Sequence, residues 1–455
     1  MSLECIQPDA AGIDIGGSFH FVAVPQGRDT ETVKKFGCFT EDLHAIADWL
    51  IKCRVKTAAM EATGVYWIPL FEVLEARGIE VYLVNSRHVK NVSGRKSDVL
   101  DCQWIQQLHS FGLLSASFQP NQAEGKLRIL VRHRSNLIRW TSMHAQLMQK
   151  ALTQMNLQLQ NAVSDILGET GMKIIRAICA GERDSKKLAQ YRDYRCKNPE
   201  ETIAKSLEGH YREEILFSLK QALQSYDHYQ SQLEACDKEI EQISKQFEDK
   251  SGGKKLVKVV KKEPKRNGVG FDTQERFFRM LGVNLSEIPG ISSTTILTVI
   301  SEIGTCVDKW RSPKAFSSWL GLCPGTKISG GKRLGGKTKK SKNRAAEVLR
   351  MAASTLSKSQ TALGAFLRRM KARLGPAKAI TATANKMAKM LYIMIKGKKN
   401  FKESGADYYE QVNKDRTMKR LRKFADRMGF DLSPKQGFED LFPNQQEASN
   451  LCTVI

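Results

Sequence analysis

Four carboxylates near the start of the chain have the types and spacing of a site for a divalent cation. Asp14 lies in the apolar segment AGIDI, and Glu61 ends a second apolar segment, VKTAAME. Asp98 and Asp101 are three residues apart at the start of an expected helix, so they share one helix face. Carboxylates brought together repel one another unless a cation is present, and an all-oxygen site suits Mg²⁺, which can bridge a phosphate and orient an attacking oxygen. We therefore predict a catalytic Mg²⁺ site at these four residues, although Asp98 alone could cap a helix and Glu61 alone could be a loop residue.

A serine in a glycine-rich, basic segment is the second candidate for chemistry. Residues 321–350 read GLCPGTKISGGKRLGGKTKKSKNRAAEVLR, with Ser329 directly before two glycines. Its hydroxyl could attack a phosphodiester, and the neighbouring Lys327, Lys332 and Arg333 could stabilise a phosphorane or lower the pKa of the hydroxyl. Judged from these residues alone, such a serine is more often a turn residue or a hydrogen-bond donor to phosphate.

Three weaker phosphate-binding patterns leave alternatives open. Residues 331–338 match a Walker A motif, but that motif needs a buried strand before it and a helix directly after it, whereas Pro324 precedes and KKSKN follows. We interpret this match as coincidental. The segment GIDIGGS resembles the phosphate-binding strand of actin-like sugar kinases, a minor alternative because no second D-x-G turn follows. IPGIS (288–292) resembles the turn of helix-hairpin-helix modules, where glycine lets backbone N–H groups meet a phosphate, but Ser292 or Ser293 could equally cap a helix.

The elements that must position the four acids are predicted from apolar spacing as a mixed sheet with helices against it. The order is β-β-β-α-β-α-β, followed by a further helix. The expected elements are two strands around a glycine turn in 11–24, a strand in 32–39, a helix in 42–53, a strand in 55–63, a helix in 67–78, a strand in 79–85 and a helix in 98–114. We assign them to an α/β domain covering residues 1–125.

The rest of the chain is predicted to be mainly helical. Residues 126–250 contain a long helix in 125–155 and near-heptad apolar spacing in 200–247, a candidate coiled coil and hence an arm or an oligomer contact. We divide the remainder into a basic linker (251–280), a second globular domain (281–400) and an extension of short helices and polar tail (401–455).

The charge of the chain points to a polyanionic partner. Lysine and arginine number 72 against 48 acids, giving a net charge of +24 and a pI near 9.6. Residues 305–400 hold 23 lysines and arginines and only two acids, Asp308 and Glu347. Such a density favours nucleic acid over a merely solvated basic face or an anionic membrane. The residues expected to contact nucleic acid lie in or beside the motifs above: Arg95, Lys96, Gly290, Lys327, Lys332, Arg333, Lys337, Lys339, Lys340, Lys342 and Arg344.

We expect neither a membrane protein nor a secreted one. No segment approaches the roughly 20 apolar residues of a membrane span. The start of the chain, MSLECIQPDAAGID, lacks the basic and then apolar regions of a signal peptide.

In combination, these segments resemble the bridge-RNA-guided DEDD transposases of bacterial insertion sequences, a serine recombinase-like family. The matching pieces are GIDIG, MEATGVYW, NSRHVKNVSGRKSDVLDCQW, IPGIS and the loop around Ser329, covering about residues 11–120 and 285–400. The resemblance implies a RuvC-like (RNase H-like) α/β N-terminal domain whose acids Asp14, Glu61, Asp98 and Asp101 hold Mg²⁺. It also implies a mainly α-helical C-terminal transposase domain whose serine falls on Ser329. The helical middle is longer than the family needs, and the extension past residue 400 has no counterpart.

The resemblance also implies the activity and the partners. A serine of a partner subunit would attack DNA and form a phosphoserine intermediate, and a structured noncoding guide RNA would pair with double-stranded donor and target DNA. We expect a homodimer or homotetramer in the bacterial cytoplasm, associated with the nucleoid. Two other functions remain open from the residues: a metal-dependent Holliday-junction or structure-specific nuclease that uses only the four acids, and a nucleic-acid-binding scaffold without catalysis.

Overall fold

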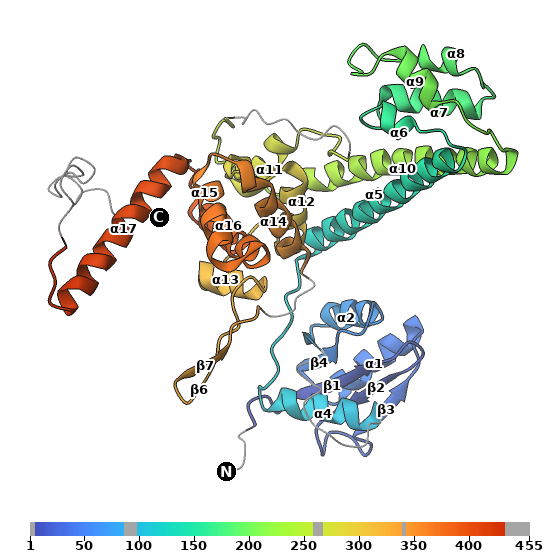
Figure 1. The fold of residues 1–455 in the computed structure, drawn as a ribbon. Helices are drawn as coiled ribbons and strands as arrows, with labels where there is room; N and C mark the ends of the chain where they lie inside the picture. The colour runs from blue at the N-terminus through green and yellow to red at the C-terminus, as the bar shows by residue number, and fades with distance from the viewer. Residues whose placement is uncertain (1–4, 86–97, 258–266, 339–342, 433–455) are drawn as a thin grey trace. The chain divides into compact units, whose positions relative to one another are not determined.

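The computed structural model describes residues 5–85, 98–257, 267–338 and 343–432 of the 455-residue chain. The chain divides into two compact units, Met1–Gln119 and Pro120–Ile455 (Figure 1). Each unit is described by itself below.

The first unit is built on a mixed five-stranded sheet with the strand order β3-β2-β1-β4-β5. Its strands are β1 (Ala10–Ile15), β2 (His20–Ala23), β3 (Val33–Phe36), β4 (Thr57–Glu61) and β5 (Glu80–Val84). Strand β1 pairs antiparallel with β2 and parallel with β4, and β4 pairs parallel with β5. The predicted order of elements and the mixed sheet are confirmed.

Helices cover both faces of this sheet (Figure 1). Helices α1 (Thr40–Lys52) and α2 (Trp67–Ala76) pack on one face against Ile13 and Met60, whereas α4 (Asp98–Ser110) packs on the other face, where Ile105 meets Ala59. Strand side chains alternate between the two faces of a sheet. Glu61 is two positions after Ala59 and so shares its face, and Asp14 is one position after Ile13 and so lies on the opposite face from it. The alternation therefore directs Asp14 and Glu61 to the α4 face.

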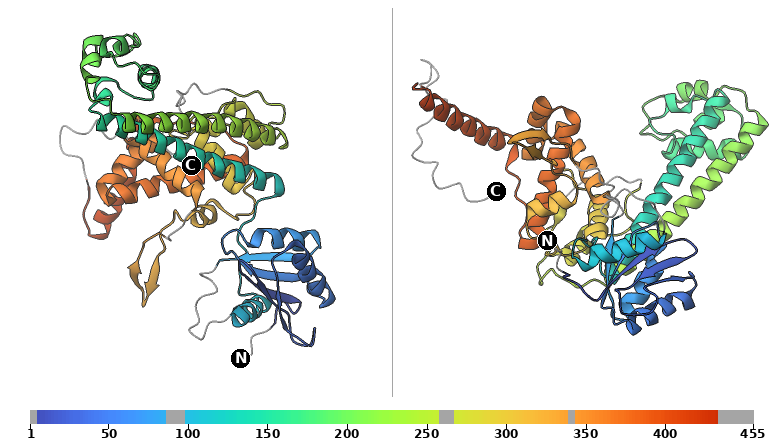
Figure 2. Two further views of the ribbon diagram at one scale, coloured as in Figure 1. Left: turned by 90° about the vertical axis from the view of Figure 1, so that its right-hand side faces the viewer. Right: turned by 90° about the horizontal axis from the view of Figure 1, so that it is seen from below.

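The second unit begins with a hairpin of two long helices, α5 (Gln122–Gln154) and α10 (Glu213–Lys245), which lie side by side in Figures 1 and 2. Leu152 packs in one cluster with Leu219, while Arg134 binds Asp237. The pair is therefore antiparallel. The apolar stripe expected to form a coiled coil thus packs on a helix of the same chain, and a supercoil between chains stays a prediction. Four short helices lie between the two: α6 (Leu159–Ala162), α7 (Glu169–Cys179), α8 (Ser185–Ala189) and α9 (Glu200–Ser206).

The remainder of the second unit is mainly helical, as predicted. It contains α11 (Thr273–Leu281), α12 (Ser293–Ile303), α13 (Pro313–Trp319), α14 (Arg344–Thr355), α15 (Ala362–Leu374), α16 (Pro376–Gly397) and α17 (Gly405–Arg427), with 3-10 turns at Leu285–Glu287 and Leu356–Lys358. A two-stranded hairpin, β6 (Lys327–Ser329) and β7 (Lys332–Gly335), lies between α13 and α14.

Two segments differ from the sequence prediction. Part of the expected linker forms α11, because Phe277, Phe278 and Leu281 recur at helical spacing and are buried. The extension past residue 400 contains one helix of 23 residues, α17, where short helices were expected. Within the described ranges, no helix combines the length and apolar character that crossing a membrane requires.

Candidate catalytic centres

Strand β1 approaches helix α4 closely because of a glycine. A Cβ placed on Gly12 would lie 2.3 Å from both the carbonyl oxygen of Cys102 and the amide nitrogen of Gln106, so only glycine fits beside this helix backbone. Asp14 is the next residue of β1 that points to the same face and is half-buried there. The contact at Gly12 thus fixes the distance between Asp14 and α4.

The direction of α4 brings its first turn to the end of the sheet that carries Asp14. Gln106 donates a hydrogen bond to the carbonyl of Ala10 at 3.2 Å, and His109 lies 2.9 Å from the hydroxyl of Thr57 at the start of β4. Later residues of α4 therefore pair with earlier residues of the strands. The helix runs antiparallel to β1 and β4, so its N-terminus lies at their carboxyl ends.

The four acids predicted to bind a metal lie on elements that meet at this end of the sheet. Glu61 is the last residue of β4, and the parallel register that pairs Ile13 with Met60 places Glu61 beside Asp14. Asp98 is the first residue of α4, and Asp101 follows one turn later. The side chain of Asp98 lies outside the described part of the structure; the other three acids share one face and one edge.

The pKa of the buried thiol of Cys102 is raised in part by the negative charges at this edge of the sheet. Burial makes the largest contribution, and the charges of Asp14 and Asp101 raise the pKa further, to about 12. The thiol is therefore neutral at physiological pH. The same potential favours a cation beside these carboxylates.

The donor set fits a hard divalent cation. Asp14, Glu61, Asp98 and Asp101 offer only oxygen ligands, which Mg²⁺ prefers over nitrogen or sulfur. Among the described side chains, without that of Asp98, no three acidic, histidine or cysteine residues form a group that could hold a metal ion. A site with three protein ligands would therefore have to include Asp98.

An exposed aromatic rim next to these acids was not foreseen from the sequence. Phe19 follows β1 and Tyr66 follows β4, and their side chains are 50% and 54% exposed. The two loops meet, because a Cβ on Gly17 would contact the Tyr66 ring at 3.7 Å. The ammonium group of Lys35 lies 3.7 Å from the centre of the Phe19 ring. Exposed rings beside a phosphodiester site can stack on bases, and the aromatic residues directly after GIDIGGS and MEATGV were the available sequence signal.

Ser329 occupies the end of an exposed β-hairpin. It is the last residue of β6, and Gly330 and Gly331 form the two-residue turn with φ of +53° and +73°. Positive φ at both positions defines the tight hairpin turn that matches strand twist and favours glycine. Ser329 pairs across the hairpin with Lys332, and its side chain is exposed. Figure 1 shows the hairpin extending away from the helices of its unit.

The base of the hairpin is attached to the helical body. Pro324 and Thr338 form a further bridge between its two arms, and Gly325 donates to the carbonyl of Lys337. Asn385 of α16 donates to the carbonyl of Leu322 at 3.3 Å. The residues of the Walker A match thus form the hairpin turn and strand β7. Ile328 and Ser329 of the preceding strand are exposed, whereas the motif needs a buried strand there, which supports the interpretation that the match is coincidental.

Only some of the residues predicted to contact nucleic acid have side chains that the structure describes. Lys332 lies opposite Ser329, Lys337 is exposed on the second arm, and Arg344 begins α14. The predicted contacts for which no side chain is described are Arg95, Lys96, Lys327, Arg333, Lys339, Lys340 and Lys342.

Gly290 has a packing role. Its φ is +81°, and a Cβ there would lie 2.8 Å from the carbonyl oxygen of Ala352 in α14. Ser292 caps α12 by accepting a hydrogen bond from the amide of Thr295. The helix-cap alternative for this segment is confirmed, and a phosphate contact at Gly290 stays a prediction.

Two family models match the chain, one over each candidate centre. Residues 11–157 match the DEDD_Tnp_IS110 family model, described as "Transposase", and residues 282–368 match a model described as "Transposase IS116/IS110/IS902 family". The first match contains all four acids, and the second contains Ser329. No curated protein matches the chain.

Proposed function

Because the chain belongs to the IS110 family of insertion-sequence DEDD transposases, enzymes that cleave and transfer DNA strands, we propose that it does so through a phosphoserine intermediate at Ser329. The observation that carries the proposal is the position of this serine. It is exposed beside a glycine turn, with Lys332 directly across the hairpin. A hydroxyl there can reach a DNA backbone, which a hydroxyl in the helical core could not.

The reaction at Ser329 is a phosphoryl transfer. Attack of Oγ on phosphorus forms the Oγ–P bond while the bond from phosphorus to a sugar oxygen breaks, and that oxygen leaves as a hydroxyl after taking a proton. Cross-strand neighbours have Cβ atoms about 5 Å apart, so the ammonium group of Lys332 can stabilise charge on the transferring phosphoryl group. Because the phosphoester bond is kept, a DNA hydroxyl can reverse the attack and join a new strand without another energy source.

The four acids are proposed to hold the DNA at the reacting phosphodiester. A divalent ion, Mg²⁺ in our proposal, would be held by Asp14, Glu61, Asp98 and Asp101 and would supply charge neutralisation for the phosphate. The residues of this chain orient the site: Gly12 sets the approach of α4, and the exposed rings of Phe19 and Tyr66 offer stacking surfaces to bases next to the phosphate. In an assembly of two or four copies, the serine of one subunit would work with the acidic site of its partner.

Guide RNA is proposed to select the DNA. The +24 charge of the chain supports binding to nucleic-acid backbone, and the resemblance of the motifs extends to systems in which base pairing by a structured RNA supplies sequence choice. Purification at low salt followed by RNA extraction and sequencing tests this part. One defined transcript is expected; random cellular RNA or none contradicts guidance.

Trapping the covalent adduct tests the chemistry. Wild-type protein incubated with Mg²⁺ and a DNA substrate should give a protein–DNA adduct that survives denaturation, and Ser329→Ala should give none. Thr326→Ala, an exposed hydroxyl deletion three residues earlier, is the matched control and should keep the adduct.

Strand cleavage that continues in Ser329→Ala would contradict the proposal. That result would support the other candidate, a junction or structure-specific nuclease in which only the acids act. Activity that survives Asp14→Ala and Glu61→Ala would instead remove the acidic site from the reaction.

A further inference from the structure

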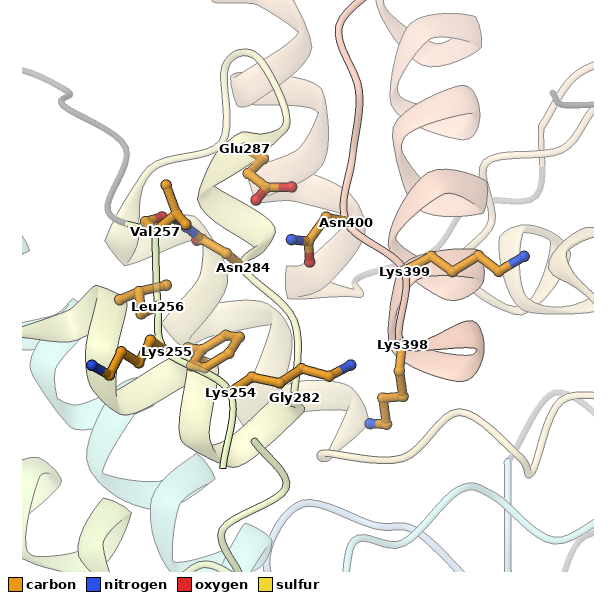
Figure 3. A pocket seen from close by; sticks show the side chains of 11 residues that line it. Lys254, Lys255, Leu256, Val257, Gly282, Asn284, Glu287, Lys398, Lys399 and Asn400 are labelled. Atoms are coloured by element: carbon orange, nitrogen blue, oxygen red, sulfur yellow. Dashed lines mark hydrogen bonds between the residues drawn. The ribbon is translucent and has the colours of Figure 1, made fainter. Parts of the chain in front are cut away.

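A cavity of about 340 Å³ in the second unit brings together cations from two distant parts of the sequence (Figure 3). One wall is the segment 254–257, which follows the helical hairpin, and the opposite wall is the segment 398–400, which follows α16. The turn after α11 closes the cavity between them. The polar and charged residues of the lining that matter here are Lys254, Lys255, Asn284, Glu287, Lys398 and Lys399.

The four lysines of this cavity are arranged as two matched pairs. Figure 3 shows the side chain of Lys254 extending across the cavity toward the segment of Lys398, whose own side chain turns toward the carbonyl of Leu281, whereas the side chains of Lys255 and Lys399 point away in opposite directions. Ammonium groups that line one cavity repel one another unless an anion lies between or beside them. The arrangement therefore gives each wall one cation turned inward and a neighbour of equal charge turned outward.

The acid in the lining does not neutralise this pair. Glu287 lies toward the other end of the cavity in Figure 3 and accepts a hydrogen bond from the amide of Phe401 at 2.7 Å. Burial raises the pKa of Glu287, and the hydrogen bond from Phe401 acts in the opposite direction. Asn284 is likewise committed, because it donates to the carbonyl of Val257 and accepts from the amide of Ser286. Lysines thus outnumber acids in the lining of the cavity. Burial lowers the pKa of Lys398, and, outside the lining, the charge of Lys250 lowers it further and that of Asp308 raises it.

Lys398 adopts a backbone conformation that disfavours a lysine. It caps α16 with φ of 49° and ψ of 37°, the left-handed region in which helices usually end on glycine. Its ammonium group donates to the carbonyl of Leu281 at 2.6 Å, and its side chain passes Gly282, where a Cβ would lie 3.3 Å from Lys398 Cδ. A strained residue whose charge is held at a cavity is a candidate for ligand binding.

We propose that this cavity binds a backbone phosphate of a nucleic-acid strand, with Lys254 and Lys398 as its ligands. The proposal rests on the proposed function only because it takes nucleic acid as the partner. It concerns a binding contact, made by residues distant in sequence from Ser329, and not the attack by the hydroxyl of Ser329. RNA and DNA share the phosphodiester that these lysines recognise. The site would anchor a strand to the transposase unit without reading bases.

Paired charge deletions test the proposal. Binding of a fluorescent oligoribonucleotide of mixed sequence and of a DNA duplex of the same sequence is measured by anisotropy at several salt concentrations. Lys254→Ala should weaken binding of at least one probe roughly two- to five-fold and lower the salt slope by about one, while Lys255→Ala, the same charge change on the adjacent residue, leaves both nearly unchanged.

Substitution of the second ligand separates binding from folding. Lys398→Gly removes the cation and relieves the left-handed strain, so it should weaken binding without lowering the melting temperature, with Lys399→Ala as its control. An effect on RNA alone, or on duplex alone, identifies the strand held. Equal losses in the inward and outward variants, or no loss in Lys254→Ala, would overturn the proposal. Absence of the Ser329 adduct in wild-type protein would refute the proposed chemistry, whereas the binding measurements above decide this site independently.

Discussion

Substitution of Gly12 by alanine tests how the acidic site is assembled. The new Cβ would lie 2.3 Å from Cys102 O and Gln106 N, both backbone atoms of α4, so no side-chain rotation can relieve the overlap. Ordinary contact needs about 3.4 Å, and α4 must therefore move by about 1 Å from β1. Overpacking of this kind costs about 1–3 kcal/mol. A displacement of about 1 Å between groups that act together can lower a rate by about 100-fold.

The assays separate these two effects. Thermal unfolding should show a modest loss of stability in Gly12→Ala, while adduct formation at a temperature where the variant is folded should fall by about two orders of magnitude. Gly17→Ala is the matched control, because its Cβ would meet the Tyr66 ring at an ordinary 3.7 Å. It should retain activity. A folded Gly12→Ala protein with wild-type activity would show that the distance between α4 and β1 does not position the acids.

Three further predictions follow from individual residues. Burial lowers the pKa of His109 from 6.5 to about 4, so the unfolded state binds more protons than the folded state between these pH values. The free energy of unfolding of the first unit should therefore fall by about 2 kcal/mol from pH 7 to pH 5. In urea unfolding, His109→Gln should flatten this pH dependence. A pH dependence unchanged in the variant would contradict the assignment. Gly331→Val forces a β-branched residue into φ of +73° and should slow adduct formation at least about tenfold, whereas Gly335→Val in the adjacent strand should not; equal effects would refute the role of the turn. Arg134→Ala leaves the buried Asp237 without its ion pair and should destabilise the second unit by about 3–5 kcal/mol in denaturant unfolding, a loss that Arg132→Ala on the exposed side should not reproduce.

The sheet and its acids were accessible from the sequence because they depend on local alternation. Asp14 and Glu61 interrupt buried strands, and a period of two places them on the face opposite Ile13 and Met60. The direction of α4 was not accessible, since it depends on contacts between residues nearly a hundred positions apart, such as Gln106 with Ala10.

The second unit shows where sequence patterns lose information. The hairpin around Ser329 was not predictable from the sequence, because strands rich in lysine and without a buried face do not show the usual apolar alternation. Ile328 and Leu334 are 67% and 69% exposed. The lysine cavity joins residues 254 and 398, which no local pattern relates. Helix α11 was assigned to a linker because basic residues precede it, although its apolar spacing was present.

Mapping the residue that carries DNA tests the central claim most directly. Protein trapped during cleavage is digested with protease and nuclease, and the modified peptide is sequenced by mass spectrometry. We expect a nucleotide joined through phosphate to Ser329, present with Mg²⁺ and absent in its chelated control and in Asp14→Asn. A nucleotide on any other residue, or DNA cut in the presence of Mg²⁺ with Ser329 never modified, would contradict the account.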